Sequence, residues 1–381
     1  MIDFPKEEKR KIAEVLVKES MRIGKKRDGS FDSVYLRYNG TDPSCEEFAY
    51  MVEEECWKVG AYVLPRRYSS LRMREMYSLA PEESIKQMDP LAEAIAKTAD
   101  VRMFIGEEDD PNWSEGLTEK YKASAPIRQR LWEIMDAKGM RWVYFGWPIP
   151  GSAKAYGCGI DEFRKIFFDS IRHSFSAETR ALSDYYHSAL KDAKEVRIVS
   201  KDTDLSFSVE GRHALVDDHV ISDEDLKNGD VGMNIPCGEV FVAPIETSAN
   251  GHILFPTVVI PGFGKINDLR LTFKDGKVVR YDARSGAERF GRFLSANTGE
   301  KDRIAELGIG TNPGAKFTGG SIIIDEKIYR TIHIAIGNNT GSYHGKNKAS
   351  SHLDMIKDMS EGRMYFDGRL VMDNGVPAKK G

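Results

Sequence analysis

The stretch that decides the fold of the second half is LRLTFKDGKVVRYDARSG, residues 269–286. Apolar and polar residues alternate on both sides of KDG (274–276), a turn sequence typical of a β-hairpin. Alternating or β-branched runs recur in four other segments, at 195–214, 238–245, 251–260 and 319–326. We therefore expect the chain from residue 194 to 381 to form a β-rich (α+β) domain in which most strands are antiparallel.

The first half has a different pattern, in which helical periodicity alternates with short strand-like runs. These runs lie at 33–39, 61–67, 101–106 and 140–148. Alternation of strands and helices with short connections predicts an α/β domain with a mainly parallel, open sheet, over residues 1–193. The helical pattern over 160–193 is long for one helix, and we expect it to break near SFSAE (174–178).

Composition restricts the classes of function. The 381 residues include 55 Lys and Arg against 59 Asp and Glu, a net charge of -4. No basic excess is available to neutralise phosphates, which argues against a partner that is nucleic acid or a membrane surface. The N-terminus lacks the apolar core of a signal peptide, no run of 18 apolar residues occurs, and the four cysteines form no CxxC pair. We therefore expect a soluble cytoplasmic protein.

Several familiar catalytic motifs are missing from the sequence. The stretch GIGTNPG (308–314) is rich in glycine, but Pro313 stands where GxGxxG has its third glycine, and the stretch lies in the β-rich half. It is therefore not a dinucleotide fingerprint. The sequence also contains no GxxxxGK[ST], HExxH or GxSxG motif.

Polar side chains that can bind a metal stand inside apolar or glycine-rich stretches of the β-rich half. They are Glu239, Glu306, His333, His352 and Asp354. A buried charge costs several kcal/mol unless it has a partner or an ion. His352 and Asp354 fit the strand period of two and project to one face. Imidazoles with carboxylates suit Zn²⁺, Mn²⁺ or Co²⁺, and three carboxylates favour two such ions over one.

Each of these residues also has an ordinary structural explanation. Glu239 follows a Pro-x-Gly turn and could be a solvated residue at a strand edge. Glu306 could end a helix over KDRIAEL (301–307), and His333 could be a core histidine with a hydrogen-bond partner. The pair H-x-D at 352–354 is common by chance. The residues alone therefore leave both interpretations open.

Taken in order, the motifs GEVFVAP, AELGIGTNP, HIAIGNN and SSHLDMI resemble those of the M29 family of metallo-aminopeptidases, the aminopeptidase T or thermophilic aminopeptidase group. The resemblance covers most of residues 194–370. It implies a β-rich catalytic domain, a homodimer, and two divalent ions (Zn, Co, Mn or Mg). The ligands that it implies are Glu239, Glu306, His333, His352 and Asp354. It further implies a catalytic tyrosine after the first histidine and an acidic residue before it, for which Tyr343 and Glu326 are the candidates, both with shifted spacing.

The implied reaction is the removal of N-terminal residues from short peptides by a metal-activated water. One alternative is a ring-cleaving dioxygenase of the dihydroxypyridine type, which resembles these peptidases. It needs a single Fe(II), for which His333, His352 and Asp354 suffice. Glu239 and Glu306 favour the peptidase, because a mononuclear site does not need them. A second alternative is a protein without catalytic activity in which metal only stabilises the β-rich domain.

Overall fold

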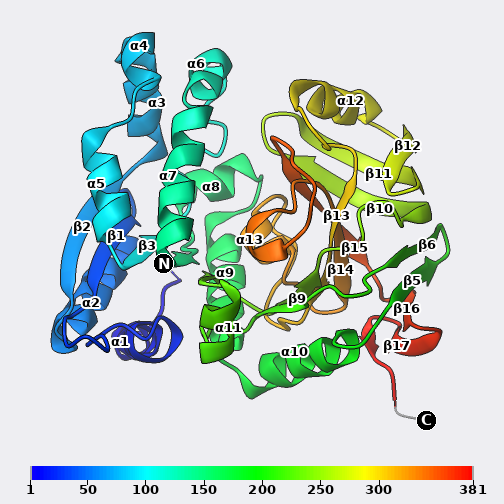
Figure 1. Ribbon diagram of the computed structural model, residues 1–381, viewed down its shortest axis with the longest axis horizontal. Coiled ribbons are helices and arrows are strands. Elements are labelled where there is room, and N and C mark those ends of the chain that lie inside the picture. Colours follow the sequence, from blue (N-terminus) through cyan, green and yellow to red (C-terminus); the bar gives the residue numbers. More distant parts are fainter. Residues whose placement is uncertain (1, 380–381) are drawn as a thin grey trace. The chain divides into compact units, whose positions relative to one another are not determined.

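The computed structural model describes residues 2–379, which fall into two compact units (Figure 1). The first unit comprises Met1–Phe168 and His219–Ile235, and the second comprises Asp169–Asp218 and Pro236–Gly381. The compact units thus divide the chain differently from the expected domains 1–193 and 194–381, and those domains stay a prediction. Among the described residues, no helix combines the length and apolarity needed to cross a bilayer.

The first unit contains a parallel sheet of five strands in the order β2-β1-β3-β4-β8. Its strands are β1 (Ser33–Asn39), β2 (Tyr62–Tyr68), β3 (Val101–Ile105), β4 (Arg141–Phe145) and β8 (Gly232–Ile235). The first four confirm the strands and the parallel arrangement that the sequence predicted. The fifth was not predicted, because a run of four residues is too short to stand out as a strand before it pairs with β4.

Helices occupy most of the remaining first unit. They are α1 (Lys6–Val15), η1 (Leu16–Ser20), α2 (Pro43–Lys58), α3 (Ser70–Leu79), α4 (Glu82–Ile85), α5 (Pro90–Thr98), α6 (Thr118–Ala123), α7 (Ala125–Lys138), α8 (Pro150–Ala155) and α11 (Asp223–Asn228). Local chemistry sets several of their ends. Asp42 caps α2 by accepting hydrogen bonds from the backbone of Ser44 and Cys45, and α7 stops at Gly139, which adopts a left-handed conformation.

The predicted break in the long helical pattern is confirmed. Helix α9 (Ile160–Ser174) ends at the expected place, and α10 (Ala177–Leu190) begins after two intervening residues. The side chain of Ser176 accepts a hydrogen bond from the backbone N–H of Thr179, which caps α10. The buried face of α10 packs into the core of the second unit through Tyr186 and Leu190.

The second unit is built from two antiparallel sheets. The larger has the order β12-β11-β10-β6-β5-β16-β17-β18, and the smaller has the order β15-β14-β13-β9-β7. The strands of the larger are β5 (Glu195–Ser200), β6 (Thr203–Ser208), β10 (Asn250–Ile260), β11 (Gly264–Lys274), β12 (Lys277–Asp282), β16 (Arg363–Phe366), β17 (Arg369–Asp373) and β18 (Val376–Pro377). The strands of the smaller are β7 (Leu215–Asp217), β9 (Glu239–Val242), β13 (Ile304–Gly310), β14 (Thr331–Gly337) and β15 (His352–Asp358). Helix α12 (Ala287–Ala296) packs against β11.

The predicted hairpin is confirmed by the pairing of β11 with β12, in which Lys274 lies opposite Lys277. The two residues between them, Asp275 and Gly276, both have positive φ, 50° and 81°. Positive φ at both positions matches the twist of the flanking strands, and aspartate and glycine tolerate it. The mainly antiparallel character of this half is therefore confirmed.

Two expectations for the second half were wrong. The β-branched stretch Ile322–Asp325 forms a short helix, α13, and not a strand. The carboxylate of Asp325 accepts hydrogen bonds from the backbone of Thr318 and Gly320, and this closes the segment into a compact turn. Residues 304–307 of KDRIAEL belong to strand β13 and not to a helix, because they pair with β14.

The two sheets of the second unit enclose one apolar core. Phe255 and Leu271 reach it from the larger sheet, and Leu307 and Ile334 reach it from the smaller one. All residues of β13 and β14 are buried, so the face of these strands that points away from the core is covered as well. Polar side chains on that second face must therefore find partners inside the protein.

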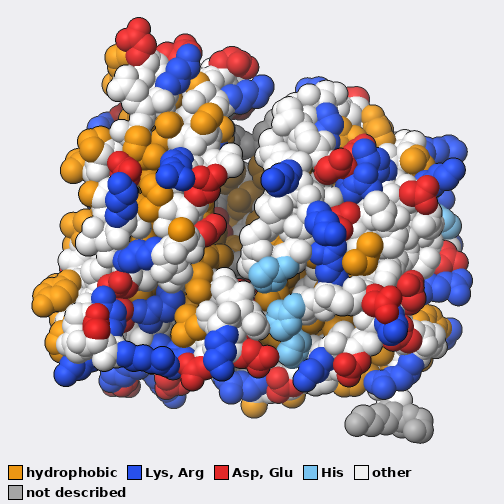
Figure 2. Space-filling model, in the orientation of Figure 1, with side chains coloured by type: hydrophobic (Ala, Val, Ile, Leu, Met, Phe, Trp, Pro, Cys, Tyr) orange, Lys and Arg blue, Asp and Glu red, His pale blue; other side chains and the backbone are white. Residues whose placement is uncertain are grey.

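Charged side chains on the surface carry both signs. On the face shown in Figure 2, basic and acidic side chains are interspersed over both parts of the molecule. This distribution agrees with the small net charge of -4. It gives no support to a polyanionic partner.

A buried asparagine fixes the segments that lead to the smaller sheet. Asn312, just after β13, is fully buried, and its Nδ2 donates to the carbonyls of Ser170 (2.9 Å) and Cys237 (2.7 Å). Its Oδ1 accepts hydrogen bonds from the backbone N–H groups of Gly314 and Ala315. Because Cys237 is two residues before β9, Asn312 sets the starting position of that strand.

We expect Asn312→Ala to lower the free energy of unfolding by about 2–3 kcal/mol, because it leaves buried carbonyl and N–H groups without partners. Urea denaturation followed by circular dichroism measures this. The control is Asn250→Ala, at an exposed asparagine of the same unit, where water replaces the lost hydrogen bonds and the change should stay within about 0.5 kcal/mol. Equal effects of the two substitutions would contradict the anchoring role of Asn312.

Candidate metal centre

The five residues singled out as metal ligands lie on four neighbouring strands of the smaller sheet. Glu239 opens β9, Glu306 lies on β13, His333 on β14, and His352 and Asp354 on β15. Since the sheet order is β15-β14-β13-β9, the structure brings all five together from segments more than 100 residues apart. As their spacing predicted, His352 and Asp354 share one face of their strand.

Glu306 lies between the two imidazoles. Its Oε1 is 3.3 Å from Nε2 of His333, and its Oε2 is 3.0 Å from Nε2 of His352. Nε2 of His352 is also 3.2 Å from Oδ1 of Asp354, and Nε2 of His333 is 3.7 Å from Oε2 of Glu239. The same ring nitrogen of each histidine therefore points at the carboxylates.

A glycine makes room for the central imidazole. Gly308 lies directly opposite His333 in the β13–β14 ladder. A Cβ atom at Gly308 would come within 2.0 Å of the His333 ring, so any larger residue would displace it. The glycine-rich stretch that is not a nucleotide fingerprint thus has a local role, which is to let an imidazole lie flat on the neighbouring strand.

The second histidine is oriented from behind. Nδ1 of His352 is 2.6 Å from the carbonyl oxygen of Asn338, to which it donates a hydrogen bond. This bond places the proton of the neutral ring on Nδ1 and leaves the lone pair of Nε2 directed at the carboxylates. Metal-binding histidines are commonly held in this way.

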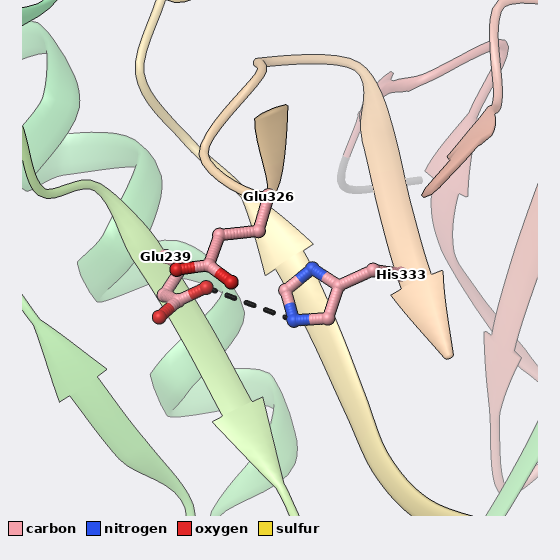
Figure 3. Close-up of side chains that lie close together, drawn as sticks. All are labelled: Glu239, Glu326 and His333. Atoms are coloured by element: carbon pink, nitrogen blue, oxygen red, sulfur yellow. Dashed lines mark ion pairs between the residues drawn. The ribbon is translucent and has the colours of Figure 1, made fainter. Parts of the chain in front are cut away.

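Three residues outside the five complete the charged group. Glu326 follows α13 and lies close to Glu239 and His333 (Figure 3). Lys327 is fully buried and pairs with Glu239, with Glu326 (2.8 Å) and with Asp217 (3.3 Å). Asp217 lies opposite Glu239 in the β7–β9 ladder. We call the set the charged cluster; its members are Asp217, Glu239, Glu306, Glu326, Lys327, His333, His352 and Asp354.

Asp217 and Lys327 were not predicted from the sequence. Lys327 stands beside Glu326 in DEKIYR, where it looks like one of several charges in a solvated turn. Only the charged triplet at 325–327, shortly before the largely apolar strand β14, could have drawn attention to it. Asp217 is followed by Asp218, and no local pattern separates it from an ordinary acidic pair.

The charged cluster contains two sets of donors that fit a metal ion. In each set, ligand atoms from three residues lie within 4.8 Å of one another. One set is Glu239, Glu326 and His333, and the other is Glu306, His333 and Asp354. Oε2 of Glu239 and Nδ1 of His333 are buried and have no hydrogen-bond partner among the described residues. Because a buried carboxylate oxygen rarely lacks a partner, Oε2 of Glu239 in particular fits a cation.

Electrostatics at the cluster draw positive charge inward. Burial acts to lower the pKa of His333, but the hydrogen bond and negative charge of Glu306 outweigh it and raise that pKa to about 9. Burial acts to raise the pKa of Glu306, yet hydrogen bonds to both imidazoles hold it well below the usual range. For Glu239, burial outweighs the attraction of Lys327 and raises the pKa to about 8. The negative charge of Glu306 thus favours the positively charged form of His333, as it would favour a metal ion at the same place.

Tyr343 also lies beside the cluster. Its ring centroid is 5.4 Å from that of His352 and 5.5 Å from that of Phe241. Burial raises the pKa of its hydroxyl well above the ordinary value, so the hydroxyl keeps its proton and can donate a hydrogen bond. The separation of ten positions between His333 and Tyr343 fits because the loop after β14 folds back on itself, with Asn338 and Ser351 joined by a backbone hydrogen bond (2.7 Å).

Two solved structures with a similar fold belong to different enzymes. AmpT from Thermus thermophilus has a TM-score of 0.76 and 20% sequence identity, and the alignment covers 98% of this chain and 100% of AmpT. The 2,5-dihydroxypyridine dioxygenase from Pseudomonas putida KT2440 has a TM-score of 0.61 and 16% identity, with 99% of each chain covered. At these identities the similarity shows the fold alone. No curated protein sequence gives a significant match.

The family described as thermophilic metalloprotease (M29) matches residues 6–375, which include nearly all of both compact units. The match therefore extends well beyond the motifs of residues 194–370 that carried the resemblance. Metalloproteases use divalent metal, and the charged cluster contains candidate donors for it. The chain belongs to the M29 family of thermophilic metalloproteases and is a peptide-bond hydrolase.

Proposed function

We propose that the protein is an aminopeptidase that removes N-terminal residues from short peptides at a centre of two divalent ions. The observation that supports two ions is the charge of the cluster. Metal binding requires ionised carboxylates and neutral imidazoles. In that state the five carboxylates of the cluster (Asp217, Glu239, Glu306, Glu326 and Asp354) are opposed by one ammonium group, that of Lys327, which pairs with three of them. Four negative charges remain, and two divalent ions balance them.

The donors divide between two subsites in this proposal. Glu239 serves one ion, and Glu306, His352 and Asp354 serve the other. Glu326, close to Glu239, is left for proton transfer. His333 lies within reach of both sets. Both sets combine carboxylate oxygens with an imidazole nitrogen, and this combination suits Zn²⁺, Mn²⁺ or Co²⁺.

Divalent ions bound in such a centre lower the pKa of a bound water and polarise a peptide carbonyl. The chain supplies the proton transfers and the hydrogen bonds to substrate. We assign to Glu326 the role of general base, which takes the proton of the attacking water and returns it to the leaving amine. Burial raises the pKa of Glu326, which makes it a better proton acceptor than an exposed carboxylate. Tyr343 donates a hydrogen bond to the oxyanion that develops on the carbonyl.

The dioxygenase remains the second candidate, because His333, His352 and Asp354 by themselves make the two-histidine, one-carboxylate set of Fe(II) oxygenases. Family membership and the second donor set both favour the peptidase. A mononuclear centre would have no second metal ion near Glu239, Glu326 and Lys327.

We expect the purified protein to contain nearly two equivalents of zinc, cobalt or manganese per chain by elemental analysis. Hydrolysis of leucyl-p-nitroanilide should disappear after chelation and return when metal is restored, because the nucleophilic water depends on the ions. One equivalent of iron without peptide hydrolysis would favour the dioxygenase. Metal that raises the melting temperature without supporting any hydrolysis would favour a structural centre.

We expect Glu306→Gln to lose metal and to lower kcat/KM at least about 100-fold, because a neutral amide replaces the carboxylate between the two imidazoles. Elemental analysis and steady-state kinetics on the same preparation measure both effects. The control is Glu300→Gln, which removes a carboxylate that pairs with Arg303 outside the cluster and should keep metal and activity. Full activity of Glu306→Gln after complete metal loss would rule out the proposal.

We expect Tyr343→Phe to lower kcat about 100- to 1,000-fold with little change in KM or metal content, because it removes one hydrogen-bond donor to the oxyanion and no ligand. The matched control is Tyr281→Phe, on β12 of the larger sheet, which should retain full activity. A wild-type kcat for Tyr343→Phe would contradict this role and would mean that other groups stabilise the developing oxyanion.

A further inference from the structure

Lys327 is a lysine with no exposure to solvent, and it lies among three carboxylates. Its Nζ pairs with Oε1 of Glu239, with Oε1 of Glu326 at 2.8 Å, and with Oδ2 of Asp217 at 3.3 Å. A buried ammonium group is costly unless its hydrogen bonds and its charge are both compensated. Here three acceptors compensate it, so Lys327 and the three carboxylates depend on one another.

The position of Lys327 relative to the donor atoms is informative. Nζ of Lys327 pairs with Oε1 of Glu239. Oε2 of the same carboxylate lies 3.7 Å from Nε2 of His333 and has no hydrogen-bond partner among the described residues. The lysine therefore binds one side of the carboxylate and leaves the other side open toward the donor set. Lys327 adds positive charge to the subsite without occupying the position that a ligand atom faces.

We infer that Lys327 is an internal cation that keeps the metal-free centre folded and, by the same charge, weakens divalent metal binding at the Glu239–Glu326–His333 subsite. This inference rests on the proposed function, because it requires that the cluster binds a divalent ion. It goes beyond that function by assigning to one residue of the chain the control of metal affinity and of stability without metal.

The two effects are linked by thermodynamics. Without Lys327, Glu239, Glu326 and Asp217 would repel one another in a buried site, and a bound divalent ion would relieve that repulsion. Loss of the lysine should therefore destabilise the metal-free protein more than the metal-loaded protein. A residue that favours the metal-free state in this way must lower metal affinity by the same factor, since coupling free energies are reciprocal.

The experiment compares wild type with Lys327→Met after chelation and after titration with Mn²⁺ alone. We expect the melting temperature of metal-free Lys327→Met to fall by about 10 °C, as for a buried ion pair that has lost one partner. Saturating Mn²⁺ should remove most of that difference. Isothermal titration calorimetry should show the weaker of the two Mn²⁺ sites tightened at least about tenfold.

A matched control separates charge from the loss of a buried lysine. Lys357 on β15 is also buried, donates to the carbonyl of Leu254 (3.1 Å), and forms no ion pair among the described residues. Lys357→Met should leave Mn²⁺ affinity unchanged, and any change in melting temperature should be the same with and without Mn²⁺.

A second variant keeps the test valid if Lys327→Met does not fold without metal. The double variant Asp217→Asn with Lys327→Met removes one charge of each sign, so the net charge of the subsite equals that of wild type. We expect its metal-free melting temperature to recover most of the loss. A double variant that melts as low as the single variant would overturn the inference, because charge would then not be the cause.

The remaining outcomes are distinct. Weaker Mn²⁺ binding by Lys327→Met would make Lys327 a residue that orients ligands and would overturn the inference. Equal destabilisation with and without Mn²⁺, at unchanged affinity, would also overturn the inference, because Lys327 would then act only as an ordinary buried ion-pair partner. If wild type binds no divalent ion at all, the proposed function itself fails, and the calorimetric titration of wild type shows this before any variant is compared.

Discussion

The burial of β13 and β14 on both faces is the constraint on which the site depends. One face of this strand pair carries Leu307 and Ile334 into the core between the two sheets. The other face carries Glu306 and His333, which are buried as well. A carboxylate and an imidazole so placed cost several kcal/mol unless partners reach them. Neighbouring strands and the segment after α13 bring those partners, and the charged cluster is the result.

The charges of the cluster are unevenly distributed. Toward β15, imidazoles alternate with carboxylates, and Glu306 is held ionised by two of them. Toward β7, carboxylates are gathered around the single ammonium group of Lys327. The chain therefore neutralises only part of the negative charge that it buries. A family of metalloproteases can use that deficit, because a divalent ion supplies the missing charge and the catalytic water together.

The parts of the candidate site that sequence could predict are those with a local pattern. His352 and Asp354 share a face because strands have a period of two, and this holds whatever the strand pairs with. The position of Tyr343 was harder to predict, because its distance from the cluster depends on how the loop after β14 folds back on itself. Asp217 and Lys327 could not be predicted, because apart from the adjacent Glu326 the partners of Lys327 come from other strands, distant in the sequence.

Local sequence patterns predicted the parallel first half, the antiparallel second half and the hairpin at residues 274–277. The family motifs singled out five candidate ligands, which the smaller sheet brings together. Only the tertiary structure decided that β8 completes the first sheet, that Ile322–Asp325 is helical, and that Lys327 lies among three carboxylates. The physical reason is the range of the interactions. Turn chemistry and the periods of strands and helices act over a few residues. The order of strands in a sheet, and the pairing of buried charges, depend on segments far apart in the chain.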